Sequence, residues 1–182
     1  MMIHPQIPNT ITVGRLILVP LLIFLLVKGE YGWALLGFTV AGLSDGVDGY
    51  LARRFRLESD LGGFLDPIAD KVLMVSIYVT LALSGQLPVW LAFLVVARDF
   101  LIIGFIMVLV SLGENVRPAP SIYSKVNTAI QVLLVVTVLA NKAFSLSIDT
   151  AIDLLVYSVA VTTIISGANY YWIWIMQRQQ KQ

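Results

Sequence analysis

Cysteine is absent from the 182-residue sequence, and histidine occurs only once. Disulfide bonds are therefore excluded, and so are the thiolate and multi-histidine sites that hold zinc. Charged residues make up only 13% of the chain, whereas 58% of it is apolar and the mean hydropathy is +0.87. This balance lies well outside that of soluble domains and predicts an integral membrane protein.

The chain shows no internal repeat, low-complexity tract or long linker, so a single domain over residues 1–182 is expected. The N-terminal MMIHPQIPNT has no basic region before an apolar run and no small-residue cleavage site. A removable signal peptide is therefore not expected. The net charge of +1 gives no indication of nucleic acid as a partner.

Six apolar segments are long enough to cross a bilayer, which takes about 20 mostly apolar residues. We place them at 11–28, 32–54, 61–84, 88–112, 121–141 and 149–175. The stretches between them are rich in Gly, Pro or polar residues that end helices. The predicted fold is an all-α membrane bundle of six transmembrane helices.

Basic residues predict the orientation of this bundle. With six spans, both termini lie on the same side as the second and fourth loops. That side carries Arg53, Arg54, Arg56, Arg117, Lys125, Arg178 and Lys181, whereas the other carries Lys28 and Lys142. By the positive-inside rule, the termini and these two loops are expected to be cytoplasmic.

Four aspartates, Asp45, Asp48, Asp66 and Asp70, interrupt the second and third apolar segments near their cytoplasmic ends. An ionised residue at the bilayer centre costs about 2.5–3.5 kcal/mol, so four scattered carboxylates would cost on the order of 10 kcal/mol. On helices, the first two aspartates share one face, and so do the last two. The short polar turn between the segments predicts antiparallel neighbouring helices on which the four carboxylates converge.

Converging carboxylates require cations, because two like charges 4 Å apart repel by about 4 kcal/mol at an effective dielectric near 20. Oxygen ligands without sulfur or imidazole favour Mg²⁺ or Mn²⁺, and two such ions would suit phosphoryl chemistry. Three alternatives stay open. The aspartates cap helices or face water, or they form the ion pathway of a cation or nucleotide transporter, or the protein is a non-catalytic membrane scaffold.

Small residues favour a ligand site over these alternatives. Gly46, Gly49, Ala52, Gly62 and Gly63 lie among the acids and leave room for a ligand to approach the backbone. A transporter would also need access from both faces, whereas the acids cluster at one end of two helices. Glycines in membrane helices also serve plain helix packing.

The run Asp45, Asp48, Gly49, Ala52, Arg53, Gly62, Asp66 and Asp70 resembles the complete signature of the CDP-alcohol phosphotransferase family. The segment PNTITVGR is similar to the family's entry to its first helix, and the six-helix layout agrees along nearly the whole chain. The resemblance implies an integral membrane enzyme, most simply of a bacterial plasma membrane. Such an enzyme displaces CMP from a CDP-linked lipid by the hydroxyl of an acceptor alcohol.

The resemblance also implies roles for individual residues. Asp45, Asp48 and Asp66 would hold two divalent ions, Mg²⁺ or Mn²⁺, with Asp70 completing the site and serving as general base toward the acceptor hydroxyl. Gly49, Ala52, Arg53 and Gly62 would bind the CDP part of the donor, the arginine through its guanidinium fork. Members of the family are often dimers, so a homodimer is implied.

Three further cations, Arg15, Arg98 and Lys125, together resemble the family's basic acceptor pocket. Arg15 and Arg98 are expected to lack a sequence neighbour of opposite charge within reach on the same helix face. Lys71, which follows Asp70 directly, is expected to snorkel or to pair.

The signature leaves the acceptor alcohol open. Phosphatidylglycerophosphate synthases, which use glycerol 3-phosphate, carry an arginine about eight residues past the AR of the fourth helix and a second lysine in the fifth. Here that arginine is missing and Asn127 takes the lysine's place. The segments AGLSDGVDGYLAR, ARDFLIIGFIMV, YSKVNTAIQVLLVV and SGANYYWIW instead look like the CMP-forming cardiolipin synthases. This likeness implies CDP-diacylglycerol and phosphatidylglycerol as the lipid substrates.

Overall fold

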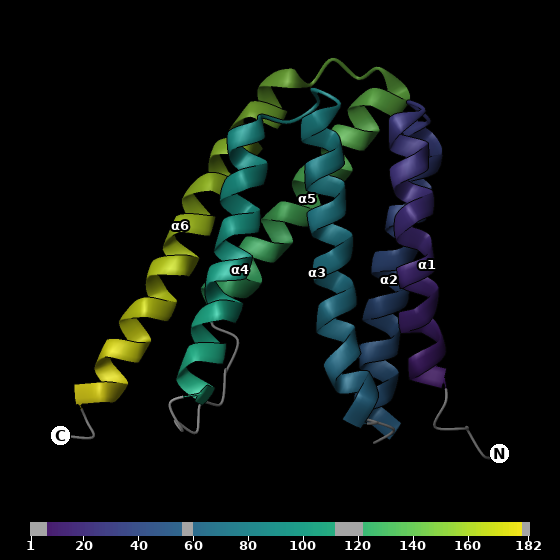
Figure 1. Cartoon of the computed structure of the whole chain (residues 1–182). Helices are drawn as coiled ribbons and strands as arrows, with labels where there is room; N and C mark the ends of the chain where they lie inside the picture. Colours follow the sequence, from purple (N-terminus) through teal and green to yellow (C-terminus); the bar gives the residue numbers. More distant parts are fainter. Residues whose placement is uncertain (1–6, 56–59, 112–121, 180–182) are drawn as a thin grey trace.

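The computed structural model describes the backbone of residues 7–55, 60–111 and 122–179 (Figure 1). Side chains are described there except at 7–13, 15, 45–68, 105–106, 108–110 and 170–179. The described residues form six helices and no strand. The helices are α1 (Ile7–Val27), α2 (Tyr31–Phe55), α3 (Asp60–Leu83), α4 (Val89–Ser111), α5 (Ile122–Phe144) and α6 (Asp149–Gln179). The all-helical prediction is confirmed, and each helix lies within a few residues of its predicted segment.

Glycines end two of these helices. Gly29 follows α1 with a φ of 77°, and Gly85 follows α3 with a φ of 70°, a backbone conformation that side chains with a Cβ rarely adopt. The next amide then reaches back five residues, so that Glu30 N donates to Leu25 O at 2.9 Å. This pattern is the Schellman motif, which satisfies carbonyls that a helix end leaves without partners.

An asparagine organises the turn between α5 and α6. Asn141 Oδ1 accepts from Ile148 N at 3.2 Å, and its Nδ2 donates to Asp149 Oδ1 at 3.2 Å. Ser145 and Ser147 adopt positive φ in the same turn. The buried amide therefore fixes the start of α6 against the end of α5.

The helices alternate in direction and pack as a bundle (Figure 1). α1 packs against α2 and α3, α5 against α2 and α6, and α4 against α3 and α6. The start of α1 and the end of α6 lie at the same end of the bundle as the end of α2 and the start of α3, the lower end in Figure 1. This arrangement agrees with an even number of helices that alternate in direction.

Apolar side chains fill the core and also cover the outside. Leu22, Tyr78 and Leu134 are fully buried, whereas Leu83 and Leu101 are 81% and 71% exposed. Within the described residues, Ile122–Phe144 and Asp149–Asn169 are long and apolar enough to cross a membrane. Exposed large apolar side chains on several helices indicate a surface that faces lipid.

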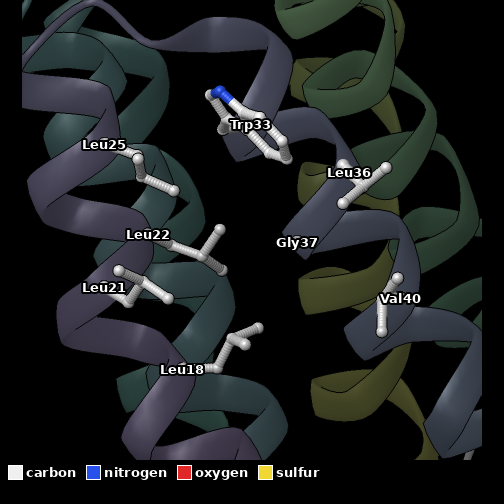
Figure 2. A pocket seen from close by; sticks show the side chains of 8 residues that line it. All are labelled: Leu18, Leu21, Leu22, Leu25, Trp33, Leu36, Gly37 and Val40. Atoms are coloured by element: carbon white, nitrogen blue, oxygen red, sulfur yellow. The ribbon is translucent and has the colours of Figure 1, made fainter.

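A groove of about 420 Å³ runs between α1 and α2 (Figure 2). It is lined by Leu18, Leu21, Leu22, Leu25, Trp33, Leu36, Gly37 and Val40. Gly37 lies close to α1, since an added Cβ there would lie 3.0 Å from Leu22 Cδ2. The glycine therefore sets the spacing of α1 and α2 along this groove.

Candidate functional site

The signature residues occupy two helices at one end of the bundle. Asp45, Asp48, Gly49, Ala52 and Arg53 lie in the last part of α2, and Gly62, Asp66 and Asp70 lie in the first part of α3. Both helices run without a break through these positions. The helical spacing on which the shared faces depend is therefore confirmed.

Of these residues, Asp70 is the one whose side chain the structure describes, and it is half-buried on α3 beside the fully buried Ala69. The side chains of the other seven lie outside the described residues. The described side chains contain no group of three acidic, histidine or cysteine residues close enough to share an ion. The convergence of the four carboxylates therefore stays a prediction.

The direct pairing expected for the two signature helices stays a prediction, because the residues at which they would meet fall within 45–68, whose side chains lie outside the described ones. In the described contacts, α1 packs extensively against both α2 and α3. α2 and α3 are antiparallel, and only four residues separate Phe55 from Asp60, so the chain holds their ends at the signature within reach of one another.

A partly buried ion cluster lies just beyond Asp70. Asp99 Oδ1 on α4 accepts from Arg98 Nη1 at 2.7 Å and lies 3.8 Å from Lys71 Nζ on α3. The side chains of Arg98 and Asp99 are only 10% and 15% exposed. The expectation that Arg98 has no neighbour of opposite charge within reach is wrong, because the long guanidinium bends round the helix to the next residue. The pairing expected for Lys71 is confirmed.

Arg98 also joins three helices. Its Nη2 donates to Ser124 Oγ on α5 at 3.0 Å and to Ser166 Oγ on α6. Sequence reasoning missed both serines because they lie 26 and 68 residues away. Lys125, next to Ser124, is exposed at the same end of the bundle, and the side chain of Arg15 lies outside the described residues. Arg98 is thus held by protein partners at the place where the sequence suggested an acceptor pocket.

Asn127 is fully buried on α5. Its Oδ1 accepts from the hydroxyls of Thr162 at 2.9 Å and Thr163 at 3.0 Å, both on α6. One turn further along α5, Gln131 is 5% exposed, and its backbone carbonyl accepts from the hydroxyl of Tyr78 on α3 at 3.2 Å. Two amides four residues apart in an apolar helix are a signal for such a polar face, but the partners could not be read from the sequence.

The arrangement combines four carboxylate positions on two helix ends with a cation-rich cluster behind them. Carboxylates at spacings of three and four residues suit hard divalent cations. The cluster brings the cations of Lys71 and Arg98 close to these positions, which suits an anionic ligand. Such a site could hold a phosphate diester beside a bound metal.

Comparison with known proteins agrees with this chemistry. A family model described as CDP-alcohol phosphatidyltransferase matches residues 5–176. The human cardiolipin synthase (CMP-forming) is 33% identical over 181 residues, covering 91% of this chain and 60% of the human protein. A Streptomyces coelicolor cardiolipin synthase (CMP-forming) is 38% identical over 109 residues, covering 57% of this chain and 51% of that protein.

A relative with a different acceptor in its name also matches. The Bacillus subtilis CDP-diacylglycerol–glycerol-3-phosphate 3-phosphatidyltransferase is 31% identical over 182 residues, covering 91% of this chain and 93% of the relative. The chain spans only about 60% of the length of the human and rat synthases that it matches. Similarity alone therefore does not distinguish the two reactions.

Proposed function

Because the chain belongs to the CDP-alcohol phosphatidyltransferase family, we propose that it transfers the phosphatidyl group of CDP-diacylglycerol to phosphatidylglycerol. The products are cardiolipin and CMP. The observation that carries this choice of acceptor is Asn127, an uncharged and fully buried side chain held by two threonines. Phosphatidylglycerophosphate synthases resemble this chain but have a lysine there, which a small dianionic acceptor needs.

The reaction is a direct displacement. The acceptor hydroxyl oxygen forms a bond to the phosphorus that bears diacylglycerol, and the bond from that phosphorus to the CMP oxygen breaks. Asp70 takes the proton of the hydroxyl, a role that requires its carboxylate within about 3 Å of the attacking oxygen. The helices carry no sequence motif for a covalent intermediate, so one displacement step is the economical route.

The family generally depends on divalent metal, and four carboxylates on α2 and α3 fit that requirement by their donor type and helical spacing. In this proposal Asp45, Asp48, Asp66 and Asp70 hold two ions, Mg²⁺ or Mn²⁺. Bound there, the ions would neutralise charge at the pyrophosphate and on the leaving CMP.

The remaining signature residues bind the donor. Gly49 and Gly62 have no side chain, so the nucleotide can lie against the backbones of α2 and α3. Ala52 has only a methyl side chain, so it leaves room for the nucleotide on the same surface. Arg53 offers a planar guanidinium with paired donors to the diphosphate.

Charge in the cluster behind Asp70 supports a lipid acceptor. Lys71 and Arg98 both contact the carboxylate of Asp99, so two cations lie beside the signature aspartate Asp70. Phosphatidylglycerol has one phosphodiester charge, and its acyl tails hold it in the bilayer, so it needs no further fixed cation. Lys125 and Arg15 are proposed to add attraction for the lipid phosphate at the rim.

A second candidate is phosphatidylglycerophosphate synthesis with glycerol 3-phosphate as acceptor. It is favoured by the Bacillus subtilis relative, whose length the chain covers almost completely. The donor, the metal site and the bond changes would be the same in both reactions. The difference lies only in the alcohol that reaches Asp70.

We also propose that all six helices span the membrane and that the signature end of the bundle is cytoplasmic. The two helices with clear spanning character and the exposed apolar surface of the others support six spans. The excess of basic residues at the signature end supports the orientation. A homodimer in a bacterial plasma membrane is the assembly expected from the family resemblance.

The experiment that tests this function measures CMP released by the purified protein from CDP-diacylglycerol in mixed micelles. Release is expected when phosphatidylglycerol and Mg²⁺ are both present, and cardiolipin should form in equal amount. Omitting the alcohol or chelating the metal should stop release. Equal CMP release with and without phosphatidylglycerol would contradict the proposal.

A further inference from the structure

Two buried amide nitrogens on α5 lack an acceptor within the part of the chain that the structure describes. They are Asn127 Nδ2 and Gln131 Nε2. The two side chains are 0% and 5% exposed and lie four residues apart, on one face of the helix. A buried donor without an acceptor destabilises a fold, and in a bilayer no water surrounds the protein to compensate for it. Both nitrogens therefore require an oxygen that the described side chains do not supply.

Threonines on α6 fix the direction of one of these amides. The hydroxyls of Thr162 and Thr163 both donate to Asn127 Oδ1, so the amide nitrogen lies on the side away from these two donors. On the neighbouring turn, the hydroxyl of Tyr78 donates to the backbone carbonyl of Gln131. The two NH₂ groups have no partner of their own among the described residues, which leaves them as donors for a ligand.

The depth of the amides follows from the register of α3 and α5, which run in the same direction. Lys71 of α3 is linked through Asp99 and Arg98 to Ser124 of α5, and Tyr78 contacts Gln131. Both links join residues 53 positions apart, so each residue of α3 lies at about the level of the α5 residue 53 positions later. At about 1.5 Å per residue, Asn127 lies about 4.5 Å and Gln131 about 10.5 Å deeper than Ser124. The amides are therefore one to two turns deeper in the bundle than Asp70.

At that depth, a phospholipid that reacts at Asp70 has its acyl ester groups. An ester carbonyl oxygen accepts hydrogen bonds and donates none, which matches an amide NH₂, and it carries no charge, which matches two uncharged amide donors. We propose that Asn127 and Gln131 bind the ester carbonyl oxygens of a diacyl phospholipid held in the site. This inference rests on the proposed function, in which both substrates are such lipids.

The ester carbonyls have two sources, because CDP-diacylglycerol and phosphatidylglycerol both have them, whereas glycerol 3-phosphate has none. Ether-linked analogues remove the carbonyls and keep the tails, the phosphate and the headgroup. Replacing one substrate at a time by its ether analogue therefore shows which lipid contacts the amides. The test is made with the full-length protein and Mg²⁺ in mixed micelles.

For the wild-type protein, kcat/KM is expected to fall about tenfold when the contacting lipid is ether-linked, as for the loss of one or two hydrogen bonds. Asn127→Leu and Gln131→Leu should lower kcat/KM for the ester lipid and leave that for its ether analogue nearly unchanged, so that the preference disappears. Thr128→Val, on the exposed side of α5, is the matched control and should keep the full preference.

Equal use of ester and ether forms of both lipids by the wild-type protein would overturn the inference, and this result does not depend on whether any variant folds. Equal losses on ester and ether lipids in the two leucine variants would also overturn it, because the amides would then serve only the packing of the bundle. If phosphatidylglycerol is no acceptor at all, the proposed function fails, but the comparison of ester and ether CDP-lipid as donor still decides the inference. Thermal stabilisation of the protein by each lipid gives the same comparison without turnover.

Discussion

Lys71 of α3 and Asp99 of α4 form an ion pair, with Nζ 3.8 Å from Oδ1, one residue from the aspartate that we propose as general base. The same carboxylate oxygen holds the guanidinium of Arg98, which reaches on to α5 and α6. One carboxylate thus links the signature helix α3 to the other half of the bundle. Its removal should therefore affect both the stability of the bundle and the geometry at Asp70.

Asp99→Asn is expected to lower the free energy of unfolding by about 2 kcal/mol, because it removes the charged carboxylate that pairs with the largely buried Arg98 at 2.7 Å. Lys71→Met is the matched comparison. Its ion pair is longer and its side chain is 36% exposed, so the loss should stay below about 1 kcal/mol. Thermal unfolding of both variants in detergent shows which substitution destabilises the protein more. A larger loss for Lys71→Met would show that Asp99 does not organise the cluster.

Asp45→Asn, Asp48→Asn and Asp66→Asn should each reduce turnover on the order of 1,000-fold, because each removes a charged ligand from the proposed metal site. The fold should persist, since the substitutions also relieve repulsion between carboxylates. Asp153→Asn on the exposed surface of α6 is the control and should retain normal activity. The measurement is CMP release beside the melting temperature in detergent. Wild-type activity in any of the first three would remove that residue from the site.

Asp70→Asn should reduce turnover by about 10²–10⁴-fold while the protein still binds CDP-diacylglycerol. The reason is that a general base acts on the acceptor, whereas the other three aspartates and Arg53 hold the donor. Donor affinity of this variant, measured beside that of Asp45→Asn, separates the two roles. If both variants lose donor binding equally, Asp70 is chiefly a metal ligand.

Gly37→Leu should destabilise the bundle by about 1–3 kcal/mol, because a Cβ at this position already meets Leu22 in the groove between α1 and α2. Gly42→Leu on the same helix is the control, since a Cβ there has nothing within 4 Å. Thermal unfolding of the two variants compares them directly. Equal stability of both would mean that the close approach at Gly37 does not constrain the two helices.

The helix boundaries were predictable from the sequence because local signals set them. Gly29 and Gly85 end α1 and α3 by adopting positive φ, and such glycines stand out between apolar segments. The signature residues were also recognisable, because their spacing places them on single helix faces. Both features depend on residues close together in the chain.

The surroundings of Arg98 and Asn127 were not predictable, because their partners come from other helices. Which serine or threonine of α6 faces each of them depends on how that helix packs against α4 and α5. The ion pair between Arg98 and Asp99 was also missed. Reasoning from helix faces places neighbouring residues on different sides and neglects how far a guanidinium can reach.

The most direct test of the account offers phosphatidylglycerol and glycerol 3-phosphate together, at equal CDP-diacylglycerol, to the purified protein with Mg²⁺ in mixed micelles. Mass spectrometry then identifies the lipid products. The account predicts cardiolipin as the main product, with phosphatidylglycerophosphate at least tenfold lower, about 1.4 kcal/mol in transition-state free energy. Efficient formation of phosphatidylglycerophosphate with no cardiolipin would contradict it and establish glycerol 3-phosphate as the acceptor.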